Sequence, residues 1–451
     1  MKKSYEMDMC NGPLFGKILL FSIPLILSGV LQLLFNAADI VVVGRFAGST
    51  ALAAVGSTSS LINLLTNLFI GFSVGANVLV AQFYGAKREK DVSETVHSAI
   101  LLSVISGILL LVIGLTTTRQ ILVWMGTPND VLEQAALYLK IYFLGMPSML
   151  LYNFGSSILR AVGDTRRPLY YLSFAGVINV ILNLIFVIVF HMGVAGVAIA
   201  TIVSQTVSAI LICRLLMRMD SCCRLEKEKL RLTANKTLQI MRIGFPAGLQ
   251  GMVFSLSNVL IQSSVNSFGS VAMAGNTAAM NIEGFIYVAM NTFQQTSMSF
   301  ISQNFGAGKQ ERIRKVLLMC LGMVTVVGVV FGVSAYFAGE PLLSIYSSDA
   351  EVIKYGLSRM AIICTMYCLC GIMDTMVGAL RGIGYAFIPM IVSLMGACGL
   401  RIIWIFTVFR WQHSLESLYI SYPISWTITG LVHMLCYVII RRKQLRRLES
   451  C

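Results

Sequence analysis

Charged residues are scarce in this sequence. Asp, Glu, Lys and Arg make up 12% of its 451 residues, whereas 57% are hydrophobic and the mean hydropathy is +0.79. A water-soluble domain has about 25% charged residues, so this chain has too little charge to cover a soluble globule of its size. The composition therefore excludes a soluble enzyme, a disordered protein and a nucleic-acid-binding protein.

Catalytic and metal-binding motifs are also missing. The sequence has no GxxxxGK[ST] or HExxH motif, and its 11 cysteines lack CxxC spacing. Without the first motif, ATP binding in a P-loop does not drive the protein. The cysteines resemble small apolar residues more than a disulfide framework or a zinc site. We expect no enzyme activity, no cofactor and no structural metal.

Long apolar stretches are what the sequence does contain. A helix that spans a bilayer needs about 20 mostly apolar residues. We count twelve such stretches: 17–43, 51–83, 95–117, 133–158, 169–190, 193–217, 241–265, 272–304, 316–338, 352–380, 386–409 and 417–440. The sequence therefore predicts an all-α polytopic membrane protein with twelve transmembrane helices.

Positive charge is distributed unevenly between the loops. If both termini are cytoplasmic, 27 of the 34 Lys and Arg residues, Lys2 and Lys3 among them, fall on the cytoplasmic side. Only Arg45, Arg119, Lys354 and Arg410 fall outside. Cytoplasmic loops of membrane proteins are rich in Lys and Arg, which supports this orientation. Anionic inner-leaflet lipids are the expected counter-charge, so no nucleic acid is needed, and we expect a monomer.

The chain repeats itself at an offset of about 221 residues. The matching pairs are Ser157–Gly163 with Gly378–Gly384, Gln82–Lys87 with Gln303–Lys309, and Ser22–Pro24 with Gly244–Pro246. Each half has six apolar stretches, so both halves begin on the same membrane side and are related by a pseudo-twofold axis along the membrane normal. Transporters with such repeats hold substrate near the midplane and expose it to alternate faces.

The repeat predicts the domain organisation. We expect an N-terminal six-helix lobe (1–217), a cytoplasmic linker (218–240), a C-terminal six-helix lobe (241–440) and a basic cytoplasmic tail (441–451). Pro24 and Pro246 occupy matching positions in the first and seventh stretches. A proline inside a helix removes a backbone hydrogen bond and permits bending, so both are candidate hinges.

Three acids lie deep within apolar stretches: Asp39, Glu283 and Asp374. A carboxylate at the centre of a membrane helix costs roughly 2.5–3.5 kcal/mol on insertion scales, so each needs a partner, a proton or a water-filled cavity. An acid that takes up and releases H⁺ or Na⁺ provides what an ion-coupled antiporter requires. The alternatives are a structural cap for Asp39, an architectural role for Glu283, and an ion pair with Arg381 for Asp374.

Polar and aromatic neighbours accompany these acids. Asn36 and Gln32 precede Asp39 on one helical face, where amide oxygens suit hydrogen bonding or Na⁺ coordination. A stripe around Glu283 combines negative charge with aromatic and Met side chains, which suit varied organic cations; helix packing is the alternative. The expected substrate-binding residues are Gln32, Asn153, Met280, Glu283, Tyr287, Met290, Asn291 and Arg401.

Buried cations are the remaining candidates. Arg401, in the eleventh stretch, is expected either to neutralise an acid of the second lobe or to extend to the surface. Arg359 lies near the N-terminal end of the tenth stretch. Long basic side chains in such places commonly extend their charge to the interface, and we expect this of Arg359.

The whole chain resembles the multidrug and toxic compound extrusion (MATE) family of the MOP flippase superfamily. The resemblance rests on several stretches: Pro24 with Gln32–Gly44, Ala51–Gly56, Asn153 with Ile158–Thr165 and Pro168, Gly193–Thr201, and Gln303–Lys309. It implies two six-helix lobes, a bacterial plasma-membrane location, and export of lipophilic organic cations in exchange for H⁺ or Na⁺. Asp39 and Asp374 match acids that family members use for coupling in the first and second lobe.

Two positions depart from the family pattern. One branch often carries an Asp on the fifth span, where this chain has Asn183 in Asn179–Asn183. Asn cannot release a proton, so Asn183 and Asn179 are expected to ligate Na⁺ or to orient Asp39. Some relatives also carry an acid on the seventh span, where this chain has Phe254. Glu283 is expected to take that role, with Na⁺ bound at Asp39 or at Glu283 and Asp374.

Two other function classes compete with cation efflux. A flippase for lipid-linked oligosaccharides or peptidoglycan precursors shares this general architecture, and its cavity is expected to be rich in Arg or Lys. The sequence instead places three acids within the apolar stretches, whereas Arg401 is the main basic residue expected there. A channel would not need titratable groups in both lobes. The sequence favours a secondary active efflux transporter.

Overall fold

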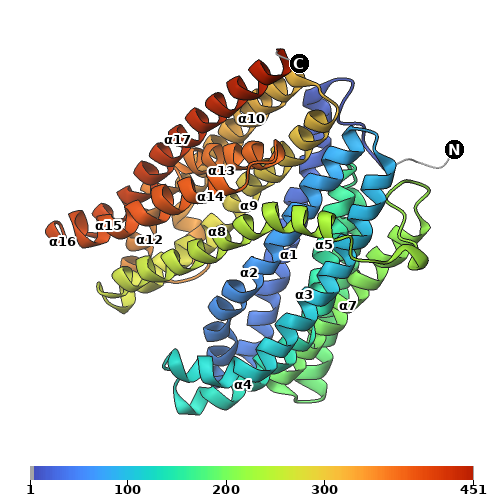
Figure 1. The fold of residues 1–451 in the computed structure, drawn as a ribbon. Helices are drawn as coiled ribbons and strands as arrows, with labels where there is room; N and C mark the ends of the chain where they lie inside the picture. Colours follow the sequence, from blue (N-terminus) through green and yellow to red (C-terminus); the bar gives the residue numbers. More distant parts are fainter. Residues whose placement is uncertain (1–4, 450–451) are drawn as a thin grey trace. The chain divides into compact units, whose positions relative to one another are not determined.

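The computed structural model describes residues 5–449. The predicted Lys2 and Lys3 and the last two residues of the predicted tail lie outside this range. The described chain is helical throughout, without a strand (Figure 1). Residues with apolar, helix-favouring side chains form long helices here because a spanning segment must satisfy all its backbone hydrogen bonds internally.

The first half of the chain forms the helices of six apolar stretches. They are α1 (Leu14–Phe46), α2 (Ser49–Gly85), α3 (Glu89–Trp124), α4 (Asn129–Leu144) with α5 (Met146–Ala161), α6 (Arg166–Leu184) with the π-helical turn η1 (Ile185–Val189), and α7 (Gly193–Arg218). The bend between α4 and α5 measures 48°. Each of the first six expected stretches coincides with one of these helices or with the bent pair.

The second half repeats the pattern. Its helices are α8 (Ala234–Asn266), α9 (Ser270–Gly306), α10 (Gln310–Phe337), α11 (Gly339–Ser344), α12 (Ala350–Ile363), α13 (Tyr367–Gly382), α14 (Phe387–Ser393), η3 (Leu394–Gly399), α15 (Leu400–Phe406), α16 (Val408–Trp411) and α17 (Leu415–Glu449). α12 and α13 are bent by 49°, like α4 and α5. The π-helical turns η1 and η3 fall in the fifth and eleventh stretches, which are equivalent in the repeat.

Nine helices of the described chain are long and apolar enough to cross a membrane, or up to eleven when each bent pair counts as one span. α9 covers the remaining stretch, 272–304, and has 37 residues. Asn, Gln, Ser and Thr side chains recur along it and make it less apolar than the others. All twelve expected stretches are thus helical.

Two compact units divide the chain, and two of the three boundaries between them fall inside helices. Unit 1 comprises Ile23–Gly248 and the segment that ends at Asp8, whereas unit 2 comprises Met9–Ser22 and the chain from Leu249 onward. The chain passes from one unit to the other within two residues of Pro24 in α1 and of Pro246 in α8. The boundary in the middle of the chain is therefore in α8 and not in the polar segment 218–240.

The polar segment after α7 is docked on unit 1. The ring of His97 on α3 bonds the backbone of Glu226, with its Nε2 accepting from the Glu226 amide at 3.0 Å. Lys236, at the start of α8, forms an ion pair with Asp91 of α3. These contacts hold the beginning of α8 against α3, so the predicted linker is a packed part of unit 1.

Glycines permit the first half of α8 to approach α2 closely. Gly71 and Gly75 on α2 face Gly244 and Gly248 on α8, each pair in GxxxG spacing. A Cβ atom on Gly75 would lie 2.2 Å from the carbonyl oxygen of Ile240, and one on Gly71 would lie 2.2 Å from the amide nitrogen of Gly248. Small residues at this spacing allow membrane helices to pack backbone against backbone.

This packing predicts the effect of Gly75→Leu. The added side chain must push α8 away from α2, and overpacking of this kind costs about 1–3 kcal/mol. We expect a lower melting temperature of the detergent-purified protein. Gly56→Leu on the same helix is the matched control, because a Cβ atom at Gly56 meets nothing within 4 Å. Equal melting temperatures for the two variants would contradict the close approach.

Candidate functional site

Unit 1 contains a cavity of about 190 Å³ between α1, α5, α6 and α7. It brings together five residues that the sequence singled out: Gln32, Asn36, Asp39, Asn153 and Asn179. These residues come from three helices and are up to 147 positions apart in the chain, yet they line one space. The cavity is smaller than the roughly 300–1,000 Å³ of pockets for drug-sized ligands, so its size suits an ion with a few water molecules.

Asp39 is held by an amide chain at this cavity. Asn183 Nδ2 donates a short hydrogen bond to Asp39 Oδ1 and a second one, at 3.2 Å, to Asn179 Oδ1. Asn179 and Asn183 are one turn apart on α6, so both amides lie on the same face. Asn179 Nδ2 in turn donates to Thr201 Oγ1 of α7 at 3.4 Å. Asn183 thus orients Asp39 directly.

The electrostatics of the cavity leave Asp39 available to a cation. No ion pair of Asp39 forms within residues 5–449, and Arg160, which lines the same cavity, donates to Ser157 Oγ at 2.7 Å. The Oδ1 atom of Asn183 is buried and has no hydrogen-bond donor in the described structure. A carboxylate, amide oxygens and a hydroxyl are therefore grouped as oxygen ligands.

Sequence reasoning did not assign Arg160, Thr201 and Gln205 to this site. All three line the cavity. Thr201 is the last residue of Gly193–Thr201, a stretch that supported the family resemblance. The sequence therefore did contain a signal for Thr201. Nothing in the local sequence around Gln205 marks it, because its place in the cavity follows from how α7 packs on α6. No cluster of three His, Cys, Asp or Glu side chains suited to a metal occurs among the described residues.

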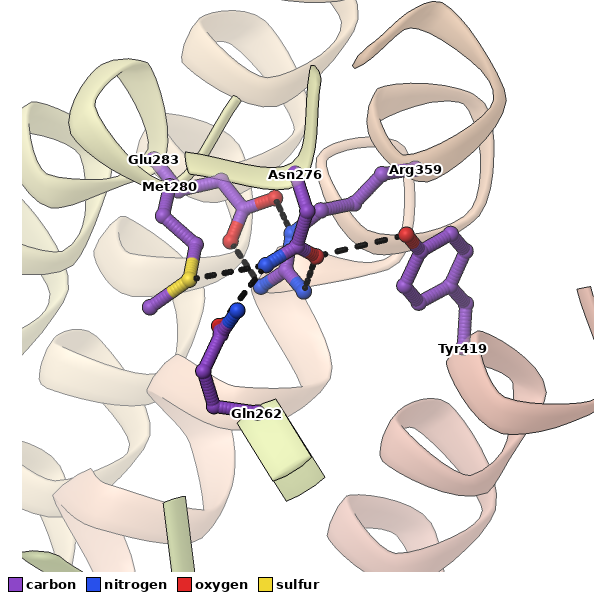
Figure 2. A network of polar contacts seen from close by, with 6 residues as sticks. All are labelled: Gln262, Asn276, Met280, Glu283, Arg359 and Tyr419. Atoms are coloured by element: carbon purple, nitrogen blue, oxygen red, sulfur yellow. Dashed lines mark hydrogen bonds and ion pairs between the residues drawn. The ribbon is translucent and has the colours of Figure 1, made fainter. Parts of the chain in front are cut away.

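A different arrangement surrounds Glu283 on α9 in unit 2 (Figure 2). Arg359 of α12 binds its carboxylate with two hydrogen bonds, Nε to Oε1 at 2.8 Å and Nη2 to Oε2 at 2.7 Å. Arg359 Nη1 also donates to Asn276 Oδ1 at 2.8 Å, and the Tyr419 hydroxyl donates to the same oxygen at 3.3 Å. Asn276 Nδ2 donates to Gln262 Oε1 at 2.9 Å. The network is fully bonded.

This pairing changes the interpretation of both charges. Arg359 is only 3% exposed, so the expectation that it extends to the surface is wrong. Its guanidinium is held inside unit 2 because Glu283, Asn276 and the ring of Tyr419, 5.3 Å away, satisfy it. Both carboxylate oxygens of Glu283 are occupied. The coupling and substrate-binding role predicted for Glu283 would require this bidentate pair to break.

Asp374 on α13 has no such partner. It is buried at 7% exposure, and within the described chain it forms no hydrogen bond or ion pair. The ion pair with Arg381 that the sequence left open is therefore not formed. Arg401 is 4% exposed and donates to Ser425 Oγ at 2.8 Å, so it stays inside the unit.

The charge balance inferred from sequence also needs correction. The sequence predicted three acids inside the membrane and Arg401 as the main basic residue beside them. Arg359 and Arg381 are buried as well, at 3% and 7% exposure. The local sequence places both near segment ends, whereas packing draws their side chains inward. Unit 2 is thus rich in arginine, which removes the sequence-based argument against anionic cargo.

The residues of the expected stripe on α9 differ in how deeply their side chains are buried. Met280 and Tyr287 are both 42% exposed. Asn291 is tied to two neighbours, donating to Gln294 Oε1 at 2.9 Å and accepting from Gln295 Nε2 at 3.0 Å. Met290 is fully buried against Gly371 of α13, and its role in substrate binding stays a prediction.

The Glu283–Arg359 pair predicts a non-additive effect on stability. Glu283→Gln leaves a buried guanidinium without its counter-charge, and removing one partner of a buried pair costs about 3–5 kcal/mol. Arg359→Gln should cost a similar amount, whereas the double variant should recover part of the loss. Melting temperatures of the three variants measure this cycle. Two losses that simply add would show that the residues are not coupled.

Comparison with known proteins places these sites in a family. The family model MatE matches residues 24–185 and again 246–407. Because one model matches both halves, the internal repeat is confirmed. The Bacillus subtilis protein named "Probable multidrug resistance protein YoeA" is 27% identical over 95% of this chain and 95% of its own length. "Probable multidrug resistance protein NorM" of Thermotoga maritima is 25% identical over 84% of this chain and 82% of its own.

Solved structures agree on the fold. A crystal structure of a MATE transporter in complex with MaL6 superposes with a TM-score of 0.91 at 20% identity and covers 100% of both chains. An outward-facing multidrug resistance MATE transporter of the MOP superfamily gives the same score, identity and coverage. The predicted all-α fold of twelve helices in two lobes is thereby confirmed. The chain belongs to the MATE family and is a multi-pass membrane protein of transporter type.

Proposed function

We propose that this protein exports lipophilic organic cations from a bacterial cell in exchange for H⁺ or Na⁺. It acts from the plasma membrane with both termini in the cytoplasm. Two lines of support lead to this proposal. Relatives that align with nearly the whole chain are named multidrug resistance proteins, and the uneven distribution of Lys and Arg fits the orientation.

Asp39 in the cavity of unit 1 is the observation that carries the proposal. A carboxyl group in a membrane helix with no basic partner must be neutralised by a proton or by a bound cation. The small cavity gives it contact with water or an ion, and the amides of Asn183 and Asn179 hold it in place. Uptake and release of one positive charge at Asp39 is the coupling step.

Oxygen atoms around Asp39 support either ion. For H⁺, the carboxyl group alone suffices, and Asn183 serves to orient it. For Na⁺, the carboxylate would be joined by Asn183 Oδ1, which lacks a donor, and by the Thr201 hydroxyl next to Asn179. Both versions use the same residues of unit 1 and differ in whether the amide and hydroxyl oxygens ligate the ion.

The two prolines support alternating access. Pro24 and Pro246 lie where α1 and α8 pass from one unit to the other. Each removes a backbone hydrogen bond from its helix, and such sites are where helices bend. Asp39 lies on α1, four turns after Pro24, so a change of bend at Pro24 moves the acid relative to its partners on α6. Ion binding and helix geometry are thereby linked.

Asp39→Asn tests the coupling step. Asn cannot take up and release a proton and carries no charge to attract Na⁺, so we expect export of ethidium from cells to fall to the level of cells without the protein. Expression and melting temperature should stay close to wild type. Asp130→Asn, at an exposed acid in the first turn of α4, is the matched control and should export normally. Unaltered efflux by Asp39→Asn would remove Asp39 from the mechanism.

Imposed gradients identify the coupling ion. In vesicles that contain the purified protein, we expect ethidium movement to be driven by an imposed pH gradient or by an imposed Na⁺ gradient, and the drive to vanish in Asp39→Asn. If Na⁺ is the ion, Thr201→Val should weaken the Na⁺ response because it removes an oxygen ligand. Dye movement that responds to neither gradient would reject antiport and favour the flippase alternative.

A further inference from the structure

Two adjacent cysteines lie in the polar segment between α7 and α8. Cys222 and Cys223 are the central residues of a turn, which is closed by a hydrogen bond of 2.9 Å from the Arg224 amide to the Ser221 carbonyl oxygen. Neither cysteine forms a disulfide. Because they are neighbours in the chain, the two thiols stay within reach of each other in every arrangement of the surrounding helices.

The two thiols differ in accessibility and in acidity. Cys223 is fully buried, whereas Cys222 is half-buried and lines a cavity of unit 1. Hydrogen bonding from the Cys223 thiol lowers the pKa of the Cys222 thiol below its ordinary value. The same interaction, together with burial, raises the pKa of Cys223. Since the thiolate is the nucleophilic form of cysteine, Cys222 is the nucleophile of the pair and Cys223 is a thiol held beside it.

The cavity beside Cys222 has room for a small molecule. Its volume is about 540 Å³, within the roughly 300–1,000 Å³ of pockets for drug-sized ligands. Four basic and four acidic side chains line it, from the start of α3 and from the polar segment. Ser221 Oγ and Thr233 Oγ1 on the same wall are buried and have no hydrogen-bond partner among residues 5–449. This lining suits a polar molecule that carries both signs of charge.

A metal site does not account for the cysteine pair. In the part of the chain that the structure describes, no group of three or more His, Cys, Asp or Glu side chains is suited to a metal ion. Two thiols alone fall short of the four ligands of a structural zinc site. Thiol–disulfide exchange needs only two thiols, one that attacks as a thiolate and one that resolves the mixed disulfide. Cys222 and Cys223 meet that requirement.

We propose that Cys222 and Cys223 form a thiol–disulfide exchange site, which reacts with a low-molecular-weight disulfide bound in the adjoining cavity. The product is a disulfide between the two neighbouring residues. In the proposed membrane orientation this segment is cytoplasmic, where disulfides are usually transient and serve catalysis or redox sensing. The chemistry itself does not depend on that orientation.

The exchange balances over two steps. The Cys222 thiolate attacks one sulfur of the small disulfide, which forms a mixed disulfide at Cys222 and releases the first half as a thiolate. The Cys223 thiol gives its proton to that thiolate, and its sulfur attacks Cys222 Sγ and releases the second half. The second thiolate takes up the proton that Cys222 had given to water. Two protein thiols are thus oxidised, and one small disulfide is reduced to two small thiols.

The position of the two cysteines makes the exchange reversible. Cα atoms joined by a trans peptide, as here, lie about 3.8 Å apart, closer than the roughly 4.4–6.8 Å usual for disulfides. Departure from the usual geometry makes a disulfide easier to reduce. The Cys222–Cys223 bond therefore returns to two thiols when small thiols are in excess, so the pair responds to redox conditions and is not a structural crosslink.

Peptide mapping of the purified full-length protein tests the proposal. The protein is incubated with glutathione disulfide, its remaining thiols are blocked with N-ethylmaleimide, and it is digested with trypsin. Cleavage after Arg218 and Arg224 places both cysteines, and no others, in peptide 219–224. We expect this peptide to lose both maleimide labels, to carry no glutathione, and to weigh two hydrogens less than its reduced form. Dithiothreitol should restore both labels.

Single variants separate the two roles. Cys223→Ser should keep glutathione attached at Cys222, because no neighbouring thiol remains to release it. Cys222→Ser should slow the reaction of this peptide about tenfold or more, because the remaining thiol is buried and holds its proton more tightly. Cys10, a half-buried cysteine in another tryptic peptide, is the matched control in the same digest. It should lose its label only where it gains glutathione.

Three results would overturn the exchange site. Wild-type peptide 219–224 that keeps both labels would show an unreactive pair, and one that keeps glutathione would show that Cys223 does not resolve the mixed disulfide. Equal rates for Cys222→Ser and wild type would show that Cys222 is not the nucleophile. The wild-type result stands even where a variant fails to fold. No step involves transport, so a failure of antiport in vesicles would leave these measurements interpretable.

Discussion

Burial of charge in an interior without bulk water is the constraint on which this structure depends. An ionisable side chain in a membrane helix must find a counter-charge, a proton, hydrogen bonds or a small aqueous cavity. Unit 1 meets this demand at Asp39 with amides and a cavity, without a basic partner for the acid among residues 5–449. Unit 2 meets it at Glu283 with a bidentate arginine, which fixes the charge.

The two halves therefore share one helix arrangement but bury different charged residues. Both halves carry a bent helix pair at equivalent places. Each also carries a π-helical turn, η1 in the fifth stretch and η3 in the eleventh, but at different positions within these stretches. Arg160 and Arg381 are also equivalent in the repeat, yet Arg160 donates to Ser157 beside the cavity whereas Arg381 donates to Gln250. Equivalent helices thus bury an acid without a basic partner in the described part of unit 1, and three arginines in unit 2. The physical difference lies in which residues can offset each buried charge.

Two helices are continuous across the unit boundaries. α1 and α8 each begin in one unit and end in the other, with a proline next to the change. The first half of α8 is held on α2 through glycines in GxxxG spacing, so that half is anchored. Each proline removes one backbone hydrogen bond from its helix close to the point where the helix changes unit.

The sequence by itself determined the twelve apolar segments, the repeat and the presence of Asp39, because hydropathy, repetition and a rare charge are properties of local sequence. It did not determine which charges meet. Glu283 and Arg359 are 76 positions apart, and Asp39 and Asn183 are 144 apart. Met290 is buried because α9 turns it toward α13, which the local sequence did not reveal. Only the packing of helices decides such contacts, since a helix period shows that one face is apolar but not which neighbour that face meets.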